Sequence, residues 1–371
     1  MPSFSYTDIN VSLPSSFPSS SVQGIQVWGL TDGGNYYGNL IFKAKGSGNG
    51  IPEGFISSLS NNSFNIYNAP TNSSVSTITG MSDQGILVGG NLPQSPIYTI
   101  PYIYQNLQYN LNPPISNPIG IDNAGTIVGS QAGSGAVYSN NSLQIINVPL
   151  KGATQTIWTA VSGNELVGSY TGSDNQTHGV SYSNNQFNYF DYNGPYASNT
   201  TLTGVNSWGE IVGEYLNQFG QHGAFYYANN QYYALTDSRI TNFGGVDQVS
   251  INNKHQITIT MHNYDQNTGL FSYFNDLVQV GVKSEVPKSA QADYIYKLYE
   301  GLFSRAPDSA GFAAWTNSKD PTTSILDQFL ASSEFNAVFN MQKDNKAFVD
   351  SLYTQILHRQ GSSNDVSYSN E

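Results

Sequence analysis

The stretch "GEIVGEYLNQFGQHGAFYYANNQYYALTD", Gly209–Asp237, contains three short runs of aromatic, β-branched and small residues, separated by turn-forming residues. Residues of these kinds favour half-buried β-strands. A fourth run, "TLTGVN", precedes them, and "NSWG" and "NN" supply turns, because Asn and Gly tolerate the positive φ of tight hairpins. We therefore predict four strands, over residues 201–206, 210–216, 223–229 and 231–237.

Similar sequences recur along the chain. A glycine that follows an apolar pair falls at Gly89, Gly129, Gly168 and Gly213, which gives a spacing of 39 to 45 residues. Two weaker copies flank these, "GGNYYGN" from residue 33 and "KHQITIT" from residue 254. Four strands in about 40 residues make one propeller blade. The sequence predicts a mainly β fold, a six-bladed β-propeller of four-stranded blades over residues 1–281, within a range of five to seven blades.

A propeller also has to close. The N-terminal text "FSYTDINVSLP" is similar to the outer-strand text "LQIINVPL" (Leu143–Leu150) and precedes any inner strand. We expect it to complete the last blade, near Leu270–Asn275, because closure removes an exposed sheet edge. The strand can come from the same chain or from a second copy. The residues expected to make this contact are Phe4, Tyr6, Ile9 and Val11.

Composition excludes several classes of function. Only 10% of the residues are charged, the net charge is −12, and there is no cysteine. Residues 1–280 contain five basic residues, Lys43, Lys45, Lys151, Arg239 and Lys254. Because a phosphate backbone requires a basic face, we predict no nucleic-acid partner. No run reaches the ~18 apolar residues of a membrane span, so none is predicted.

The start of the chain, "MPSFSYTDINVSLPSS", lacks the basic and apolar regions of a signal peptide. Low charge with abundant Asn, Ser, Thr and Tyr is typical of bacterial surface proteins. We expect a protein that is secreted to the bacterial cell surface without an N-terminal signal peptide, and a cytoplasmic protein is the alternative.

The repeats resemble a family of bacterial extracellular repeat proteins with the pattern G-I-N-x-x-G-x-I-V-G-x-Y followed by H-G-F-x-Y. The best match is "GVNSWGEIVGEY" with "HGAFYY", followed by "GIDNAGTIVGS" and "HGVSY". The resemblance covers roughly residues 23–280. It implies a propeller fold and transfers no catalytic residue.

A second segment follows an expected linker over residues 282–292. In "YIYKLYEGLFSRAPDSAGFAAW", Tyr294, Leu298 and Leu302 recur at helical spacing. This text resembles a small DUF4214-like helical domain of unknown function, found in secreted calcium-repeat toxins, surface-layer and adhesin-like proteins. We expect a helical domain over residues 293–371, in which the motif restarts at Phe348, and a truncated domain is one interpretation. The resemblance implies an exported, surface-associated protein.

The residues that could carry chemistry recur as parts of the repeat. His178 and His222 occupy equivalent positions, Asp83 and Asp122 stand where another copy has Asn206, and Glu165 and Glu210 start equivalent strands. Repeated positions favour turn and packing roles over catalysis. A carboxylate pair from Glu165, Glu210 and Glu214 leaves a glycosidase as an alternative. We predict no catalytic residue, no cofactor and no metal site, and calcium at "GSDNQTH" or "DQNTG" remains an alternative.

Tyrosines are the strongest functional signal. The chain has 26, and exposed tyrosine among Asn and Ser favours contact surfaces. We expect a non-enzymatic protein that binds other surface components or further copies of itself, as a layer, filament or adhesin. The alternative is a glycan-binding, lectin-like propeller, and a glycan-active enzyme comes third. The predicted contact residues are Tyr98, Tyr102, Tyr189, Tyr192, Tyr196, Tyr232 and Tyr233.

Overall fold

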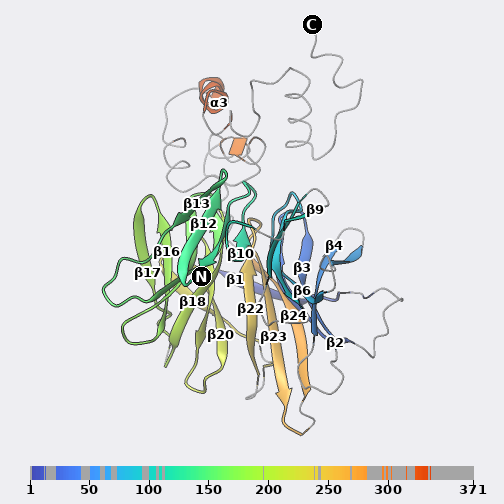
Figure 1. The fold of residues 1–371 in the computed structure, drawn as a ribbon. Coiled ribbons are helices and arrows are strands. Elements are labelled where there is room, and N and C mark those ends of the chain that lie inside the picture. The colour runs from blue at the N-terminus through green and yellow to red at the C-terminus, as the bar shows by residue number, and fades with distance from the viewer. Residues whose placement is uncertain are drawn as a thin grey trace. The chain divides into compact units, whose positions relative to one another are not determined.

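A computed structural model of the chain forms two compact units, Met1–Gly281 and Val282–Glu371 (Figure 1). The residues that it describes are 2–11, 13, 22–42, 51–58, 63–67, 73–93, 100–105, 108–110, 113–194, 196–237, 239–240, 244–267, 270–281, 295, 298–299, 302, 315, 322–332 and 335. No helix within these ranges has the length and apolar character needed to cross a bilayer.

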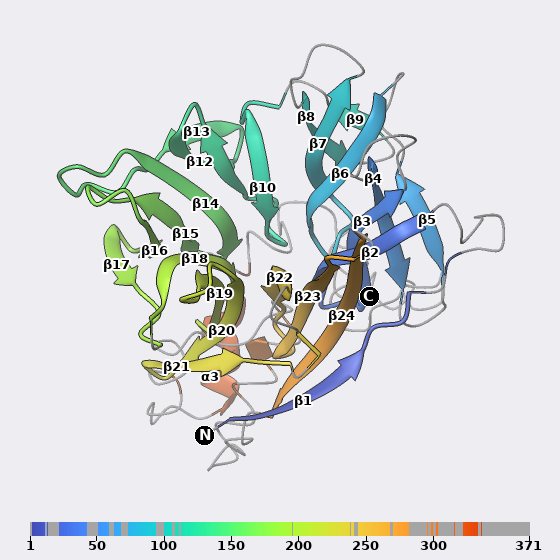
Figure 2. The same cartoon turned by 90° about the horizontal axis from the view of Figure 1, so that it is seen from below.

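The first unit is a propeller of six blades, each of four antiparallel strands (Figure 2). The predicted fold class is therefore confirmed. Blade 1 contains β2 (Val22–Leu30), β3 (Asn35–Phe42), β4 (Ile51–Ser58) and β5 (Phe64–Tyr67). Blade 2 contains β6 (Ser73–Met81), β7 (Leu87–Pro93), β8 (Ile100–Gln105) and β9 (Gln108–Asn110). One parallel bridge, from Glu53 to Ser76, joins these two blades into a continuous sheet.

The other blades follow in chain order. Blade 3 contains β10 (Asn117–Ile121), β11 (Ile127–Gln131), β12 (Ser134–Ser139) and β13 (Ser142–Ile145). Blade 4 contains β14 (Gln155–Ser162), β15 (Glu165–Thr171), β16 (Thr177–Ser183) and β17 (Gln186–Phe190). Blade 5 contains β18 (Ser198–Val205), β19 (Ile211–Leu216), β20 (His222–Ala228) and β21 (Gln231–Leu235). Blade 6 contains β22 (Gly244–Ile251), β23 (Gln256–Asp265), β24 (Leu270–Gly281) and, from the other end of the chain, β1 (Ser3–Asp8).

The repeated glycine has a structural reason. The first strand of every blade lies innermost, next to the first strands of its neighbours (Figure 2), and each is interrupted by a β-bulge. In blade 3 the bulge follows Pro118, and a Cβ on the paired Gly129 would overlap the carbonyl oxygen of Asn117. In this blade, glycine lets the second strand pass the bulge without this overlap.

The ring closes through β1, which pairs antiparallel with β24 from Ser3–Gly281 to Asp8–Asp276. Phe4 packs edge-to-face on Tyr226 of blade 5, with ring centroids 5.7 Å apart. Ile9, Val11 and Leu13 lie against the core of blade 1, so the N-terminal segment contacts three blades. β1 pairs with residues 276–281 of β24, directly after the expected partner segment Leu270–Asn275, and the N–H of Ile9 donates to the carbonyl oxygen of Asn275 at 2.8 Å.

Arg239 holds this strand in place. Its guanidinium contacts Asp8 on β1 at 2.5 Å, Asp276 on β24 at 2.5 Å and Asp237 at 2.6 Å. It also lies 4.9 Å from the ring centre of Phe274. Burial raises the pKa of Asp276 to about 6, whereas the bonds from Arg239 hold the pKa of Asp237 well below its usual range.

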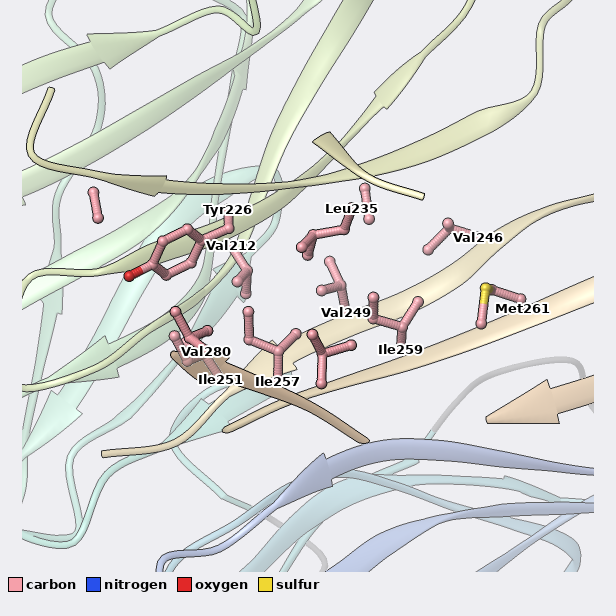
Figure 3. Packing of buried hydrophobic residues seen from close by; sticks show 13 residues of the cluster. Val212, Tyr226, Leu235, Val246, Val249, Ile251, Ile257, Ile259, Met261 and Val280 are labelled. Carbon is pink, nitrogen blue, oxygen red and sulfur yellow. The ribbon is translucent and has the colours of Figure 1, made fainter. Parts of the chain in front are cut away.

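The apolar core lies between blades. Between blades 5 and 6 it includes Val212, Tyr226, Val249, Ile257 and Ile259, which face one another across the two sheets (Figure 3). Both faces of a blade are packed in this way, so the repeating unit cannot bury its apolar surface alone.

The second unit contains α3 (Thr322–Leu330) among its described residues. Ile325 and Phe329 of this helix are buried with Tyr299, which meets Phe329 edge-to-face at 4.9 Å. Trp315 lies 5.0 Å from Phe329. The predicted repeat of the motif at Phe348 lies outside the described residues.

Candidate ligand-binding cleft

Of the seven predicted contact tyrosines, six lie among the described residues and fall into three groups. Tyr196 and Tyr189 are 77% and 44% exposed, and Tyr98 lies outside the described residues. Tyr102 is wrong as a contact residue, because it is 0% exposed and its hydroxyl donates to the carbonyl oxygen of Thr77 at 2.9 Å. Its ring lies over Gly89, and this packing explains why a large aromatic residue stands there.

The remaining three tyrosines are half-buried. Tyr192 stacks on Tyr215 at 4.1 Å and packs edge-to-face on Tyr232 at 5.6 Å, next to the core between blades 4 and 5. Burial raises the pKa of Tyr192 and of Tyr232 to about 12. Tyr233 packs on the core between blades 5 and 6, with its ring 6.3 Å from that of Phe4. These rings act mainly in packing.

Asp122 and Asn206 close the turn between the first two strands of their blades. Their side-chain oxygens accept the backbone N–H groups of Thr126 at 2.8 Å and Glu210 at 3.0 Å. The third predicted member, Asp83, is wrongly aligned, because Ser82 closes the turn in blade 2.

Asp83 instead links three blades. It accepts the N–H of Gly33 in blade 1 at 3.1 Å, and its own N–H donates to Asn123 in blade 3 at 2.8 Å. Asn253 and Asp32 make the same contact between blades 6 and 1, at 2.8 Å. The acidic residues of these turns therefore hold neighbouring blades together.

Glu210 is also a link between blades. Its carboxylate accepts the hydroxyl of Tyr226 at 2.5 Å and contacts His255 of blade 6 at 2.7 Å. Burial raises its pKa, but the hydrogen bonds from His255, Tyr226 and Asn206 outweigh burial and lower it overall. Glu165 is partly buried, and its pKa is raised by burial.

A cleft of about 320 Å³ lies between blades 5 and 6, within the size range of small-ligand sites. Blade 5 lines it with Phe219, Gly220, Gln221 and His222, at the β19–β20 turn and the start of β20. Blade 6 lines it with Gly244, Gly245 and Val246 of β22 and with His262 and Tyr264 of β23.

The turn that carries Phe219 is fixed by its own hydrogen bonds. Asn217 Oδ1 accepts the N–H of Phe219 at 2.9 Å and that of Gln221 at 3.1 Å, and Gly220 supplies the positive φ of 74°. Gln221 Nε2 then donates across the cleft to the carbonyl oxygen of Gly244 at 2.9 Å. As a result Phe219 is held with 74% of its surface in solvent.

Two histidines line the cleft, and each has a carboxylate behind it. His222 Nδ1 lies 3.4 Å from Glu214 Oε2, and His262 Nδ1 lies 2.8 Å from Asp247 Oδ1. The hydrogen bond to Glu214 raises the pKa of His222, and burial raises the pKa of Glu214. Gly245 lies between the two histidines, since a Cβ there would stand 3.5 Å from the His222 backbone and 3.8 Å from His262 Cε1. Because Gly245 has no side chain, the space between the two histidines stays open.

His178, the equivalent residue in blade 4, is engaged on both sides of its ring. Nδ1 lies 2.9 Å from Asp191 and Nε2 lies 3.2 Å from Asp174 in the preceding turn. For His222 and His262 only the Nδ1 contact is formed by described residues. The carboxylates orient these two imidazoles and leave Nε2 available for a ligand.

The two sequences considered for calcium form turns. Asp174 Oδ1 accepts the N–H of Gln176, and Asp265 Oδ1 accepts that of Asn267. Among the described residues no group of three or more His, Asp or Glu side chains could hold a metal ion.

Sequence reasoning did not identify Phe219, Gln221, His262 and Tyr264 as site residues. Phe219 does carry a signal, because an aromatic residue at the tip of a polar turn, "NQFGQ", has no core to enter. The second-strand position of His262 holds Ser169 in blade 4 and Glu214 in blade 5, so no repeated histidine marks it in the sequence.

Comparison with known proteins identifies no family for this chain: no family model matches it, and no curated protein matches it. Solved structures do match. The β-propeller domain of the Trilobed protease from Pyrococcus furiosus has a TM-score of 0.44 at 8% identity, covering 72% of this chain and 99% of that chain. A six-bladed lectin of Aleuria aurantia, described with a fucose recognition mode, has a TM-score of 0.41 at 12% identity, covering 71% of this chain and 93% of that chain.

TolB from Acinetobacter baumannii has a TM-score of 0.44 at 9% identity, covering 66% of this chain and 63% of that chain. Likenesses this distant carry no argument about the ligand. The assignment of six blades depends on the strand pairing described above.

Proposed function

We propose that this protein is a non-enzymatic carbohydrate-binding propeller, and that the cleft between blades 5 and 6 holds the sugar. The observation that supports this most directly is the pair of aromatic rings at the cleft, Phe219 and Tyr264, which are 74% and 36% exposed. Exposed rings beside polar groups favour ligands that have an apolar face and a hydroxylated edge. A sugar ring has both.

The polar groups of the cleft suit hydroxyl groups. Gln221 and His222 come from one blade and His262 from the other, so a ligand would be held from two sides. A hydroxyl group can donate to or accept from each of them. Gln221 is itself bonded across the cleft, which holds the site in shape before a ligand enters.

The arrangement of the carboxylates supports binding over hydrolysis. A glycosidase places two carboxyl groups on either side of the scissile bond. Here Glu214 and Asp247 bond to the histidines, and neither is among the residues that line the cleft. The alternative of a glycan-active enzyme is therefore not favoured.

A location at the bacterial surface, with contacts to other copies or surface components, is part of the proposal. It is supported by the low charge of the chain, 10% of residues, and by the exposed rings of Tyr189 and Tyr196. These two tyrosines favour homotypic contacts as a second function, separate from the cleft.

A glycan array tests the main proposal. The wild-type protein should bind a restricted set of glycans, and Phe219→Ser should lower binding at least about tenfold, because it removes a contact ring. Tyr196→Ser is the matched control: it removes a ring that is as exposed, 77% against 74%, but lies outside the cleft. Gly245→Val should also block binding by filling the space between the histidines. Binding that survives both cleft variants would contradict the proposed site.

A further inference from the structure

The charges around the cleft point to its selectivity. Of the residues that line the cleft in the described structure, none is Lys or Arg. Two carboxylates, Glu214 on β19 and Asp247 on β22, stand directly behind its histidines. The pKa of Glu214 is raised mainly by burial and that of His222 mainly by its bond to Glu214, and the charge of Asp247 adds to both shifts. The two carboxylates therefore act on the same part of the cleft.

Asp247 is also incompletely satisfied. Its Oδ1 contacts His262, whereas its Oδ2 is buried and has no partner within the described structure. Tyr273 on β24 lies close enough for the charge of Asp247 to raise its pKa, after the larger effect of burial. The titratable groups that these contacts place near the two imidazoles are thus carboxylates and phenols. Among the described residues that line the cleft none is Lys or Arg, so a negative charge placed here would meet no cation of this lining other than the imidazoles.

We propose that this cleft selects uncharged sugars over acidic ones, and that acidic sugars bind more tightly once His222 is protonated. The proposal depends on the carbohydrate function above and names the class of sugar. With neutral imidazoles, a uronic acid would add a third carboxylate to a site that already holds two. At an effective dielectric constant of about 20, a like charge within about 8 Å lowers affinity by a factor on the order of 10 to 100.

Protonation reverses this effect. An unperturbed histidine changes charge between about pH 5 and pH 8, and the bond to Glu214 raises the pKa of His222. Once the His222 imidazole is charged, it balances the Glu214 carboxylate behind it and offers an Nε2–H donor. A neutral sugar is affected little, since its hydroxyls either donate or accept. The ratio of neutral to acidic affinity should therefore fall as the pH falls.

The test uses three matched pairs, the methyl glycosides of glucose, galactose and mannose and their uronic acids, which replace CH₂OH by a carboxylate. Titration calorimetry is carried out on the full chain at about pH 9 and about pH 5, in buffer with EDTA. We expect at least one neutral member to bind at both pH values. Its uronic acid should bind about 10- to 100-fold more weakly at the higher pH and less than about tenfold more weakly at the lower.

Variants distinguish an effect of the carboxylate charges on binding from a loss of folding. Glu214→Gln combined with Asp247→Asn should let the uronic acid bind at the higher pH. Because these changes can cost stability, His222→Gln is a second variant, in which the pH dependence of the ratio should shrink. His178→Gln, the matched control outside the cleft, should keep the full dependence.

The outcomes are distinguishable. Equal binding of a neutral sugar and its uronic acid at the higher pH, or a ratio that does not change with pH, overturns the charge selectivity and leaves the carbohydrate function standing. If no neutral member binds at either pH, the carbohydrate function is overturned and this proposal with it.

Discussion

Gly129 shows how a single residue sets the path of two strands. The carbonyl of Asn117 points at it because the bulge after Pro118 turns the inner strand. Gly89, Gly168 and Gly213 have the same relation to Thr77, Ile157 and Thr201. In blade 6 the residue that pairs with Val246 beside the bulge is Met261, not glycine. A search for the repeated glycine therefore does not identify this blade.

Gly129→Ala should lower the free energy of unfolding by about 2 kcal/mol or more, because the added Cβ overlaps a fixed carbonyl. Urea denaturation measures the change. Gly33→Ala is the control, since a Cβ there would meet its nearest neighbour only at 3.6 Å. An equal loss in both variants would show that the bulge is not the cause.

His222 makes stability depend on pH. Its pKa is raised above the unfolded value by the hydrogen bond to Glu214. Its contribution is therefore complete below about pH 6.5 and is lost as the pH rises through the raised pKa. We expect His222→Gln to lower the melting temperature more at acidic pH than at alkaline pH. The opposite trend would mean that burial, not Glu214, controls this histidine.

At the scale of elements, the turns and strand runs were readable from the sequence. The four runs predicted for blade 5 overlap β18, β19, β20 and β21, because Asn and Gly at positive φ mark their ends. The sequence did not show which side chains point into the core and which point into solvent. Tyr102 lies in a strand with two packed faces, so alternation does not distinguish core from surface. Phe219 is exposed to solvent, and the repeat pattern does not predict that exposure.

The N-terminal strand depends on Arg239 for its polar anchor. Arg239→Gln leaves the buried Asp276 without a cation, a change that costs about 3–5 kcal/mol for a fully buried pair. More than a third of the Arg239 side chain is exposed, so we expect about 2 kcal/mol. Chemical denaturation measures this. Lys151→Gln removes the same charge at an exposed site and should have little effect. If the two variants are equally stable, Arg239 does not anchor the strand.

At the scale of the whole molecule, ring closure is complete within the first unit, since β1 and β24 both lie in Met1–Gly281. A fragment of residues 1–281 should fold alone and keep the melting temperature of the propeller in the full chain. Calorimetry of the two proteins makes the comparison. A fragment that is unfolded, or that melts at a clearly lower temperature, would mean that the propeller needs the second unit.

The cleft is also a feature of the whole molecule, because it forms only where two blades meet. His222 and His262 are 40 residues apart in the chain, and only the stacking of blades 5 and 6 puts them on one cleft. The sequence indicated a lectin-like propeller as an alternative but did not indicate which cleft between its blades would bind a sugar. The choice of cleft depends on Phe219, Gly245 and Tyr264, which lie outside the two repeated sequence motifs.

The central claim, that a sugar binds between blades 5 and 6, can be tested by nuclear magnetic resonance of the imidazole groups. The chain has five histidines, so protein labelled with ¹⁵N-histidine gives a simple spectrum. During titration with a glycan selected on the array, the signals of His222 and His262 should shift, while those of His178 and His255, which lie elsewhere, stay unchanged. A glycan that binds and moves only His178 or His255, or no histidine at all, would contradict the account.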